Sequence, residues 1–203
     1  MLVATLLTIT SASAFQVNVN YLGGASTPPG GEFLITPVGG GDSWSSFCLE
    51  AYERLPGNPY EAAVSDTAYW GGVGPVGDPL SVGVAWLYTQ FRSGTLSQYD
   101  YTFGAGRSAS AWALQNAIWM LEDESASFMS PAAGQYYYDL AQTQFGGNAK
   151  DDNNGQLPVR VLNLTSLSGA RAQDQLYLPD GGSMLALLGM SLASLGFLAR
   201  KSR

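Results

Sequence analysis

Two kinds of hydrophobic pattern follow one another along this chain of 203 residues, and their order limits the folds it can adopt. Apolar and polar residues alternate in 15–23 and again in 32–38, which is typical of half-buried strands. Residues 45–53, SSFCLEAYE, form a third candidate strand, with Cys48 and Glu50 on one side and Phe47, Leu49 and Ala51 on the other. Alternation returns in 156–164, QLPVRVLNL, far along the chain. Strands therefore stand at both ends of the domain.

The middle of the chain has helical spacing instead. Residues 81–94 and 108–123 carry apolar side chains at helical intervals, and Ser108 or Ser110 is expected to cap the second helix. A third helix is expected to begin at Pro131 and to end before two consecutive glycines. The pattern predicts an α+β or mainly β fold: a β-sandwich or barrel-like domain with a helical insertion.

The segment KDDNNGQ at 150–156 could be interpreted as a calcium-binding loop or as a turn. Its acidic and amide residues lack the spacing of an EF-hand loop, so the turn is favoured and no metal site is predicted.

Both ends of the chain carry apolar segments outside this pattern. Residues 1–14 end in Ala12-Ser13-Ala14, which indicates a signal peptide cleaved before Phe15; a short buried strand is the alternative. The basic residues that usually precede the apolar part are missing, so we expect the true start to lie upstream.

The apolar run at 184–199 predicts a transmembrane helix. It would cover roughly 24 Å, slightly less than a bilayer core, and is followed by Arg200, Lys201 and Arg203. Basic residues directly after such a helix stay on the cytoplasmic side, so residues 15–177 would form one extracytoplasmic domain.

Charge and residue types exclude several functions. Ahead of the basic tail, six basic residues (nine minus three) stand against sixteen acidic ones, a net charge of −10. This balance argues against a nucleic-acid partner, because phosphates need a basic surface. The chain has no histidine, so it lacks the usual general base, the usual zinc ligand and any Cys-His dyad. We expect no cofactor, no metal and no conventional hydrolase.

Cys48 is the only cysteine. Exported proteins usually pair their cysteines, so an unpaired thiol requires an explanation. Gln115 raises a similar question, because it lies on one helix face with the apolar residues Ala111, Trp112, Ile118 and Trp119. A buried amide without partners costs about 1–3 kcal/mol. The structural alternatives are a hydrogen-bonded core glutamine and a cysteine that acts as a small apolar residue.

The two segments Phe47-Cys48-Leu49 and Leu114-Gln115-Asn116-Ala117-Ile118-Trp119 together resemble the paired signature of bacterial surface thioester domains. The likeness extends over about 15–164, but only these two short motifs are specific.

The resemblance implies an intramolecular thioester between the Cys48 sulfur and the Gln115 side-chain carbonyl, formed with loss of ammonia. Phe47, Trp112 and Trp119 would keep the pocket dry. An amine on an unknown surface partner could then attack the Gln115 carbonyl and become covalently attached. Such a protein reacts once and is not an enzyme. The sequence assigns no catalytic acid or base.

Residues 178–203 resemble exosortase-type sorting signals of the PEP-CTERM class. The motif Leu178-Pro179-Asp180-Gly181-Gly182-Ser183 precedes the apolar run and the basic end, in the family's order. The resemblance implies an exosortase-type partner, insertion in the inner membrane, and transfer to the cell surface or extracellular matrix.

We therefore expect an exported, surface-sorted protein that serves adhesion or matrix attachment through a Cys48–Gln115 thioester. One alternative is a non-reactive structural surface protein with the same sorting signal. A weaker one is a carbohydrate-binding module built on Tyr136, Tyr137 and Tyr138, which point in different directions on a helix.

Overall fold

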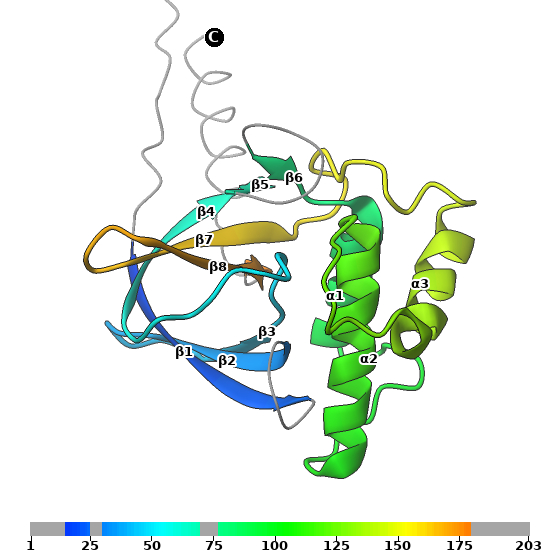
Figure 1. The fold of residues 1–203 in the computed structure, drawn as a ribbon, viewed down its shortest axis with the longest axis horizontal. Helices are drawn as coiled ribbons and strands as arrows, with labels where there is room; N and C mark the ends of the chain where they lie inside the picture. The colour runs from blue at the N-terminus through cyan, green and yellow to red at the C-terminus, as the bar shows by residue number, and fades with distance from the viewer. Residues whose placement is uncertain (1–14, 25–29, 70–76, 180–203) are drawn as a thin grey trace, which may run out of the picture.

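The computed structural model describes residues 15–24, 30–69 and 77–179, which form a mixed domain with an antiparallel sheet and a group of helices (Figure 1). The α+β prediction is confirmed, and the helices lie between strands in the chain as expected. The sheet strands are β1 Phe15–Gly24, β2 Gly31–Pro37, β3 Trp44–Ser46, β4 Tyr60–Ser65, β7 Arg160–Ser166 and β8 Arg171–Tyr177. A small pair is formed by β5 Thr67–Ala68 and β6 Asp78–Pro79. The helices are α1 Val82–Arg92, α2 Ala105–Leu121 and α3 Pro131–Gln144.

The sheet has the strand order β3-β2-β1-β4-β7-β8, with antiparallel neighbours throughout. The chain that follows β3 runs beside β8, so the two edges of the sheet are joined. The Leu49 N–H donates to the Asp174 carbonyl at 3.1 Å, and the Leu176 N–H donates to the Phe47 carbonyl at 3.0 Å. Cys48 therefore lies directly opposite Gln175 of β8. The cysteine belongs to the seam where the two edge strands, β3 and β8, meet.

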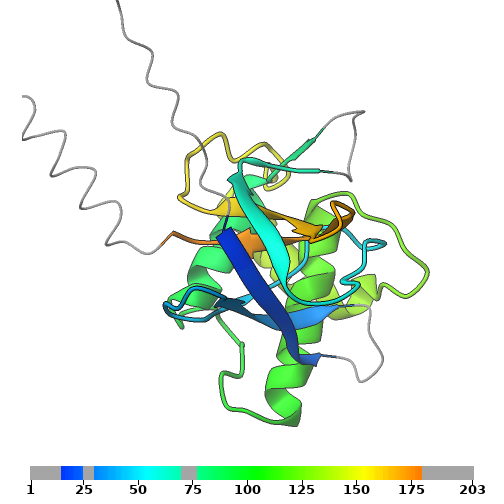
Figure 2. The ribbon, with the colours of Figure 1, turned by 90° about the vertical axis from the view of Figure 1, so that its left-hand side faces the viewer.

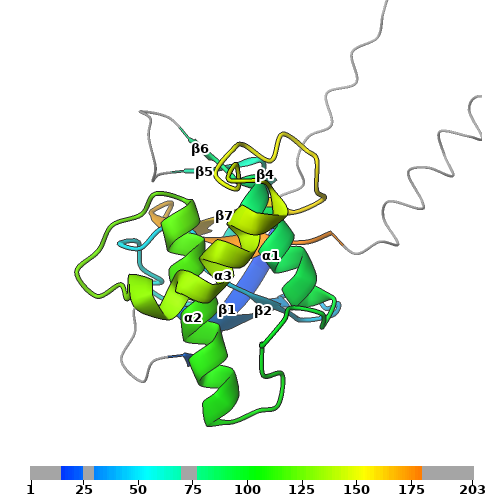
Figure 3. The ribbon, with the colours of Figure 1, turned by 90° about the vertical axis from the view of Figure 1, so that its right-hand side faces the viewer.

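The helices cover one side of the sheet. Figure 3 shows them in front of the strands, and Figure 2 shows the opposite side, where β1 and β4 are nearest the viewer. Helix α2 contacts β1 and β2 on one side and α3 on the other. Helix α1 is held at the seam by the Tyr88 hydroxyl, which donates to the Ser45 carbonyl (2.8 Å) or the Leu176 carbonyl (3.2 Å).

Several local predictions need correction. The predicted strand at 45–53 ends at Ser46, and only Cys48 continues the pairing, because the chain turns away after Leu49. Helix α2 begins at Ala105 after Gly104, whose φ of 144° places it in the region that favours glycine. Ser108 and Ser110 therefore lie within the helix and do not cap it; the Ser110 hydroxyl accepts a hydrogen bond from the Asp100 N–H instead.

The buried apolar side chains form two groups separated by the Cys48 segment and α2. The sheet-side cluster contains Val17, Val19, Phe33, Ile35, Cys48, Ala51, Tyr60, Ala62, Trp119, Leu162, Leu164 and Ala172. The helix-side cluster includes Phe47 and Leu49 together with Leu114 and Ile118 of α2. Consecutive residues 47, 48 and 49 thus alternate between the two clusters, as strand geometry requires.

Among residues 15–24, 30–69 and 77–179, no helix is both long and apolar enough to cross a membrane. The predicted signal peptide at 1–14 and transmembrane helix at 184–199 lie outside the described residues. The same holds for the sorting motif beyond Pro179 and for Arg200, Lys201 and Arg203.

The close contact between α2 and α3 depends on Gly134. A Cβ atom there would lie 2.6 Å from the Ala117 backbone nitrogen and 2.8 Å from the Asn116 carbonyl carbon. We expect Gly134→Ala to lower the free energy of unfolding by about 1–3 kcal/mol, although alanine is otherwise the better helix former. Chemical denaturation measures this. Gly39→Ala is the control, since nothing lies within 4 Å of its Cβ position; equal effects of the two substitutions would contradict the packing argument.

Candidate functional site

The thiol of Cys48 and the carboxamide of Gln115 are in direct contact, although 67 positions separate them in the sequence. The distance between Cys48 Sγ and Gln115 Oε1 is 3.2 Å, and the thiol donates to the carbonyl oxygen. Both side chains have 0% exposure to solvent. The two residues singled out from separate sequence motifs are therefore neighbours in a site closed to bulk water.

The Gln115 carboxamide is held by the backbone of Cys48 itself. The Cys48 N–H donates to Gln115 Oε1 at 3.2 Å, and Gln115 Nε2 donates to the Cys48 carbonyl at 2.8 Å. This pair of hydrogen bonds compensates the burial of the amide and fixes its orientation. The carbonyl oxygen points at both the thiol and a backbone donor, which polarises the carbonyl carbon toward a nucleophile.

Contacts on both sides of Cys48 hold it against α2. On one side, residues 47 and 49 are hydrogen-bonded to β8, as described above. On the other side, the Ala51 N–H donates to Glu124 Oε2 at 3.0 Å, just past the end of α2. The position of the thiol is thus determined by the sheet and by the helix together.

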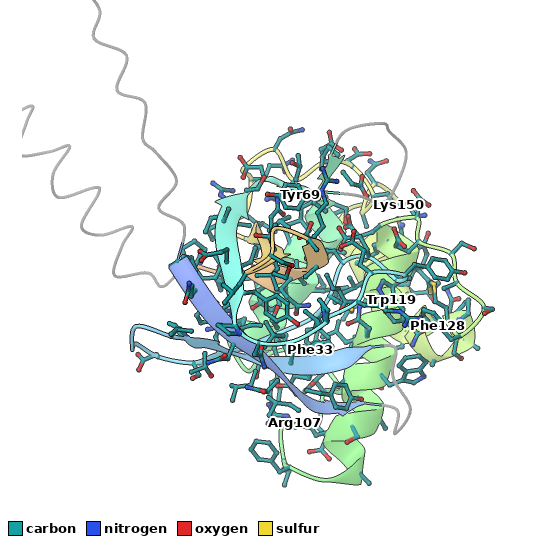
Figure 4. All side chains as sticks on the ribbon, turned by 60° about the vertical axis from the view of Figure 1, so that its left-hand side comes forward. Phe33, Tyr69, Arg107, Trp119, Phe128 and Lys150 are labelled. Carbon is teal, nitrogen blue, oxygen red and sulfur yellow. The ribbon has the colours of Figure 1, made fainter. Side chains whose placement is uncertain are left out.

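Aromatic rings and a glycine surround the pair. Trp119 is completely buried one helical turn after Gln115, and its ring lies edge to face with Trp112 (centroids 6.1 Å apart) and Phe128 (5.7 Å). Figure 4 labels Trp119 and Phe128 on the same side of the domain. A Cβ atom on Gly30 would lie 2.4 Å from the Trp119 ring and 2.8 Å from Gln115 Cγ, so only glycine fits there.

Phe47 lies on the other side of the Cys48 segment. Its ring packs edge to face against Phe91 of α1, with centroids 5.0 Å apart, in the helix-side cluster. Of the three residues predicted to line the pocket, the structure brings Trp119 and Trp112 together and directs Phe47 toward the helices.

The surroundings keep the thiol protonated. Burial raises the pKa of Cys48 well above its ordinary value, and the nearby Glu50 and Glu124 carboxyls raise it further. Its own backbone N–H and the indole N–H of Trp119 act in the opposite direction. A reaction at this sulfur must therefore transfer the thiol proton while the new bond forms. Otherwise nearby hydrogen-bond donors must stabilise the thiolate.

Three carboxyl groups gather behind the cysteine segment, on Glu50, Glu53 and Asp174, with oxygens within 4.8 Å of one another. Burial and the negative neighbours raise the pKa of Glu50 to about 10 and of Glu53 to about 7. Burial also raises the pKa of Asp174 to about 6. Both Asp174 oxygens accept backbone N–H groups, from Leu164 at 3.1 Å and Tyr69 at 2.6 Å. Among the described residues this is the group of carboxyls whose spacing could suit a metal ion.

A groove of about 610 Å³ lies over the sheet-side cluster that contains Cys48 and Trp119. Val19, Phe33 and Ala51 belong both to its wall and to that cluster, while Leu55 and Phe128 pack against the cluster from above. Its rim carries Tyr21, Tyr52, Glu53 and Arg54. Neither Cys48 nor Gln115 lines the groove, but Ala51 of its wall lies three residues after Cys48.

Two neighbours of the site were missed by sequence reasoning. Glu124 follows the second helical segment without any motif of its own, yet it holds the segment after Cys48. Gln175 lies opposite Cys48 in β8, within a stretch, RAQDQLY, that looks exposed because it is polar, although residues 172–176 are all buried. Nothing in the sequence pattern marks either residue.

Comparison of the chain with protein-family models, with curated proteins and with solved structures gives no match. The function must therefore be inferred from the site itself.

The buried carboxyls predict an unusual dependence of stability on pH. An unfolded glutamate titrates near pH ~4.3, whereas Glu50 and Glu122 have folded-state pKa values of about 10 and about 8. Above pH ~4.3 the folded state therefore binds more protons than the unfolded state, so the free energy of unfolding should fall as pH rises from about 5 to 9. Denaturation at several pH values measures this.

The Glu50→Gln variant should show a smaller slope over the same range, because the substituted side chain does not titrate. A stability that increases from pH 5 to 9 in the wild-type protein would contradict this account of the buried carboxyls.

Proposed function

We propose that this protein attaches covalently to an amine-bearing partner through an internal thioester between Cys48 and Gln115. The observation that carries the proposal is the 3.2 Å contact between the Cys48 thiol and a Gln115 carbonyl that already accepts a backbone N–H. This geometry supports an acyl transfer within the chain, because nucleophile, electrophile and oxyanion donor are adjacent before any reaction.

In the first step the sulfur of Cys48 attacks the side-chain carbonyl carbon of Gln115. The S–C bond forms, and the carbonyl oxygen becomes an oxyanion beside the Cys48 N–H. The C–N bond then breaks, and the thiol proton leaves on the nitrogen as ammonia. The dry surroundings of Trp119 protect the product from hydrolysis.

In the second step a primary amine of the partner attacks the same carbonyl carbon. The new C–N bond replaces the S–C bond, a proton of the amine passes to the sulfur, and Cys48 is released as a thiol. The groove beside Ala51 and Phe128 is the proposed route for the amine, and the Glu53 carboxyl on its rim, with a pKa of about 7, can accept a hydrogen bond from the amine when ionised. The protein reacts once, so we propose a covalent attachment device and not an enzyme.

The main alternative is a non-reactive structural surface protein. In that case the Gln115 carboxamide would serve only to join α2 to the cysteine segment, and Cys48 would remain a buried thiol. The carbohydrate-binding alternative has less support, since Tyr137 is 2% exposed and cannot stack on a sugar together with Tyr136 and Tyr138.

We also propose export, anchoring by residues 184–199 in the inner membrane, and exosortase-type sorting to the cell surface or matrix. These proposals rest on the sequence motifs of 1–14 and 178–203. For the fold, the hydrogen bonds that join residues 47–49 to β8 favour a barrel-like description of the sheet.

The intact mass of residues 15–177 tests the thioester directly. We expect a mass lower than that of the sequence by one ammonia, followed by a gain of one methylamine when that amine is added. A mass equal to the sequence, with a thiol that alkylates after unfolding, would reject the proposal.

The matched controls are Cys48→Ala and Gln115→Ala. Each should abolish both mass changes, because each removes one atom of the proposed bond. Retention of the ammonia loss in Cys48→Ala would assign the change to another site.

The groove predicts a difference between small and large amines. Leu55→Trp should fill the groove and slow the reaction with a lysine-containing peptide by at least about tenfold, while methylamine and the thioester itself are affected much less. Equal slowing of both amines, or of neither, would place the route elsewhere.

A further inference from the structure

Gln175 is the closest cross-strand neighbour of the Cys48 side chain. The backbone bonds that join this region run from Leu49 to Asp174 and from Leu176 to Phe47, so Cys48 and Gln175 form a pair without hydrogen bonds of its own. In antiparallel sheets such pairs have the shorter Cα separation, about 4.5 Å, and their side chains lie on the same face. The register with β7 agrees, because Gln175 also faces Leu162 of the sheet-side cluster.

The Gln175 carboxamide is buried without a hydrogen bond. The residue has 0% exposure, and neither Oε1 nor Nε2 has a partner within the described part of the chain. An unsatisfied buried amide costs about 1–3 kcal/mol, and a leucine or methionine would avoid that cost. A carboxamide in this position suggests that its hydrogen-bond partner is present only in another chemical state of the site.

A second unpartnered donor belongs to Trp119, which lies in the same sheet-side cluster as Cys48. The indole N–H of Trp119 has no hydrogen-bond partner among the described residues, yet it acts on the Cys48 thiol in the direction that favours the thiolate. Gln175 and Trp119, both neighbours of Cys48, thus each carry a buried N–H donor that has no partner among the described residues.

We propose that the Gln175 Nε2–H and the Trp119 Nε1–H form a donor pair for the Cys48 sulfur, stabilising its negative charge when an amine displaces it from the Gln115 carbonyl. This inference rests on the proposed thioester. It makes Gln175 a catalytic residue of the acyl transfer, contributed by the last strand of the sheet.

Negative charge develops on two different atoms during the reaction, which supports two separate sets of hydrogen-bond donors. When the amine adds, the charge develops on the Gln115 oxygen, where the Cys48 N–H lies. When the C–S bond breaks, its electron pair passes to the sulfur. The sulfur then carries a negative charge until the proton from the amine reaches it. A thiolate buried among apolar residues needs its own donors, because burial disfavours the charge.

The test compares Gln175→Met with the wild-type protein. Methionine has a similar size and shape but no N–H, so we expect acylation by methylamine, per molecule of thioester, to slow about ten- to hundredfold. The free energy of unfolding should be unchanged or higher, because an unsatisfied amide is removed. An unchanged rate would overturn the inference.

The control variant is Asn163→Leu. Asn163 is another buried amide with an unpartnered oxygen, on neighbouring β7, and it points away from the sheet-side cluster because its neighbours Leu162 and Leu164 point into it. We expect its rate to equal that of the wild-type protein. Equal slowing of both variants would indicate a general packing effect and reject a role for Gln175.

A second readout does not depend on the thioester. In the Gln115→Ala background, where no thioester can form, the pH dependence of Cys48 labelling by methyl methanethiosulfonate reports the pKa of the thiol. Adding Gln175→Met should raise that pKa, and adding Trp119→Phe should do the same; no change with either would overturn the donor pair.

The outcomes separate the two proposals. A wild-type protein without a thioester would reject the proposed function, and this inference with it. A wild-type protein that reacts with methylamine as fast as Gln175→Met does would reject only the inference.

Discussion

The paired hydrogen bonds between the Gln115 carboxamide and the Cys48 backbone are the contact on which the rest of the site depends. They join a helix in the middle of the chain to the seam of the sheet, and they satisfy an amide that burial would otherwise penalise. Because the same backbone N–H that orients the carbonyl also lies where an oxyanion would form, the structural and the chemical roles of this contact coincide. Loss of the contact would leave both the amide and the cysteine backbone unpaired in the core.

The seam between β3 and β8 explains why the thiol faces this amide. Pairing of residues 47–49 with β8 forces alternate side chains to opposite faces, so Phe47 and Leu49 enter the helix-side cluster while Cys48 enters the sheet-side cluster. A shift of one residue in this pairing would exchange the faces and direct the sulfur away from Gln115. The last strand thus fixes the direction of the Cys48 side chain, and it brings Gln175 and the buried carboxyl of Asp174 with it.

Much of the fold follows from local patterns, and the exceptions have physical causes. The three helices, and the strands β1, β2 and β7, lie where periodicity predicts them, and Pro131 begins α3 as expected. Strand β8 was missed because its buried residues include Gln173, Asp174 and Gln175, whose polarity imitates an exposed loop. The start of α2 was misplaced because a glycine of unusual backbone conformation, and not a serine side chain, begins the helix.

The sequence by itself determined which residue types are available: one cysteine, no histidine, and a glutamine in a tryptophan-rich helix face. It also marked the cysteine and the glutamine as a pair, through the resemblance of their two motifs to a known signature. Local spacing cannot say how far apart those motifs lie in space, nor which groups approach them from elsewhere in the chain. Only the tertiary structure decided that Phe47 turns toward the helices, that Glu124 holds the cysteine segment, and that Gln175 lies opposite Cys48 in the strand pairing. The physical reason is that strand pairing across the whole domain, which no local pattern encodes, fixes the direction of each side chain at the seam.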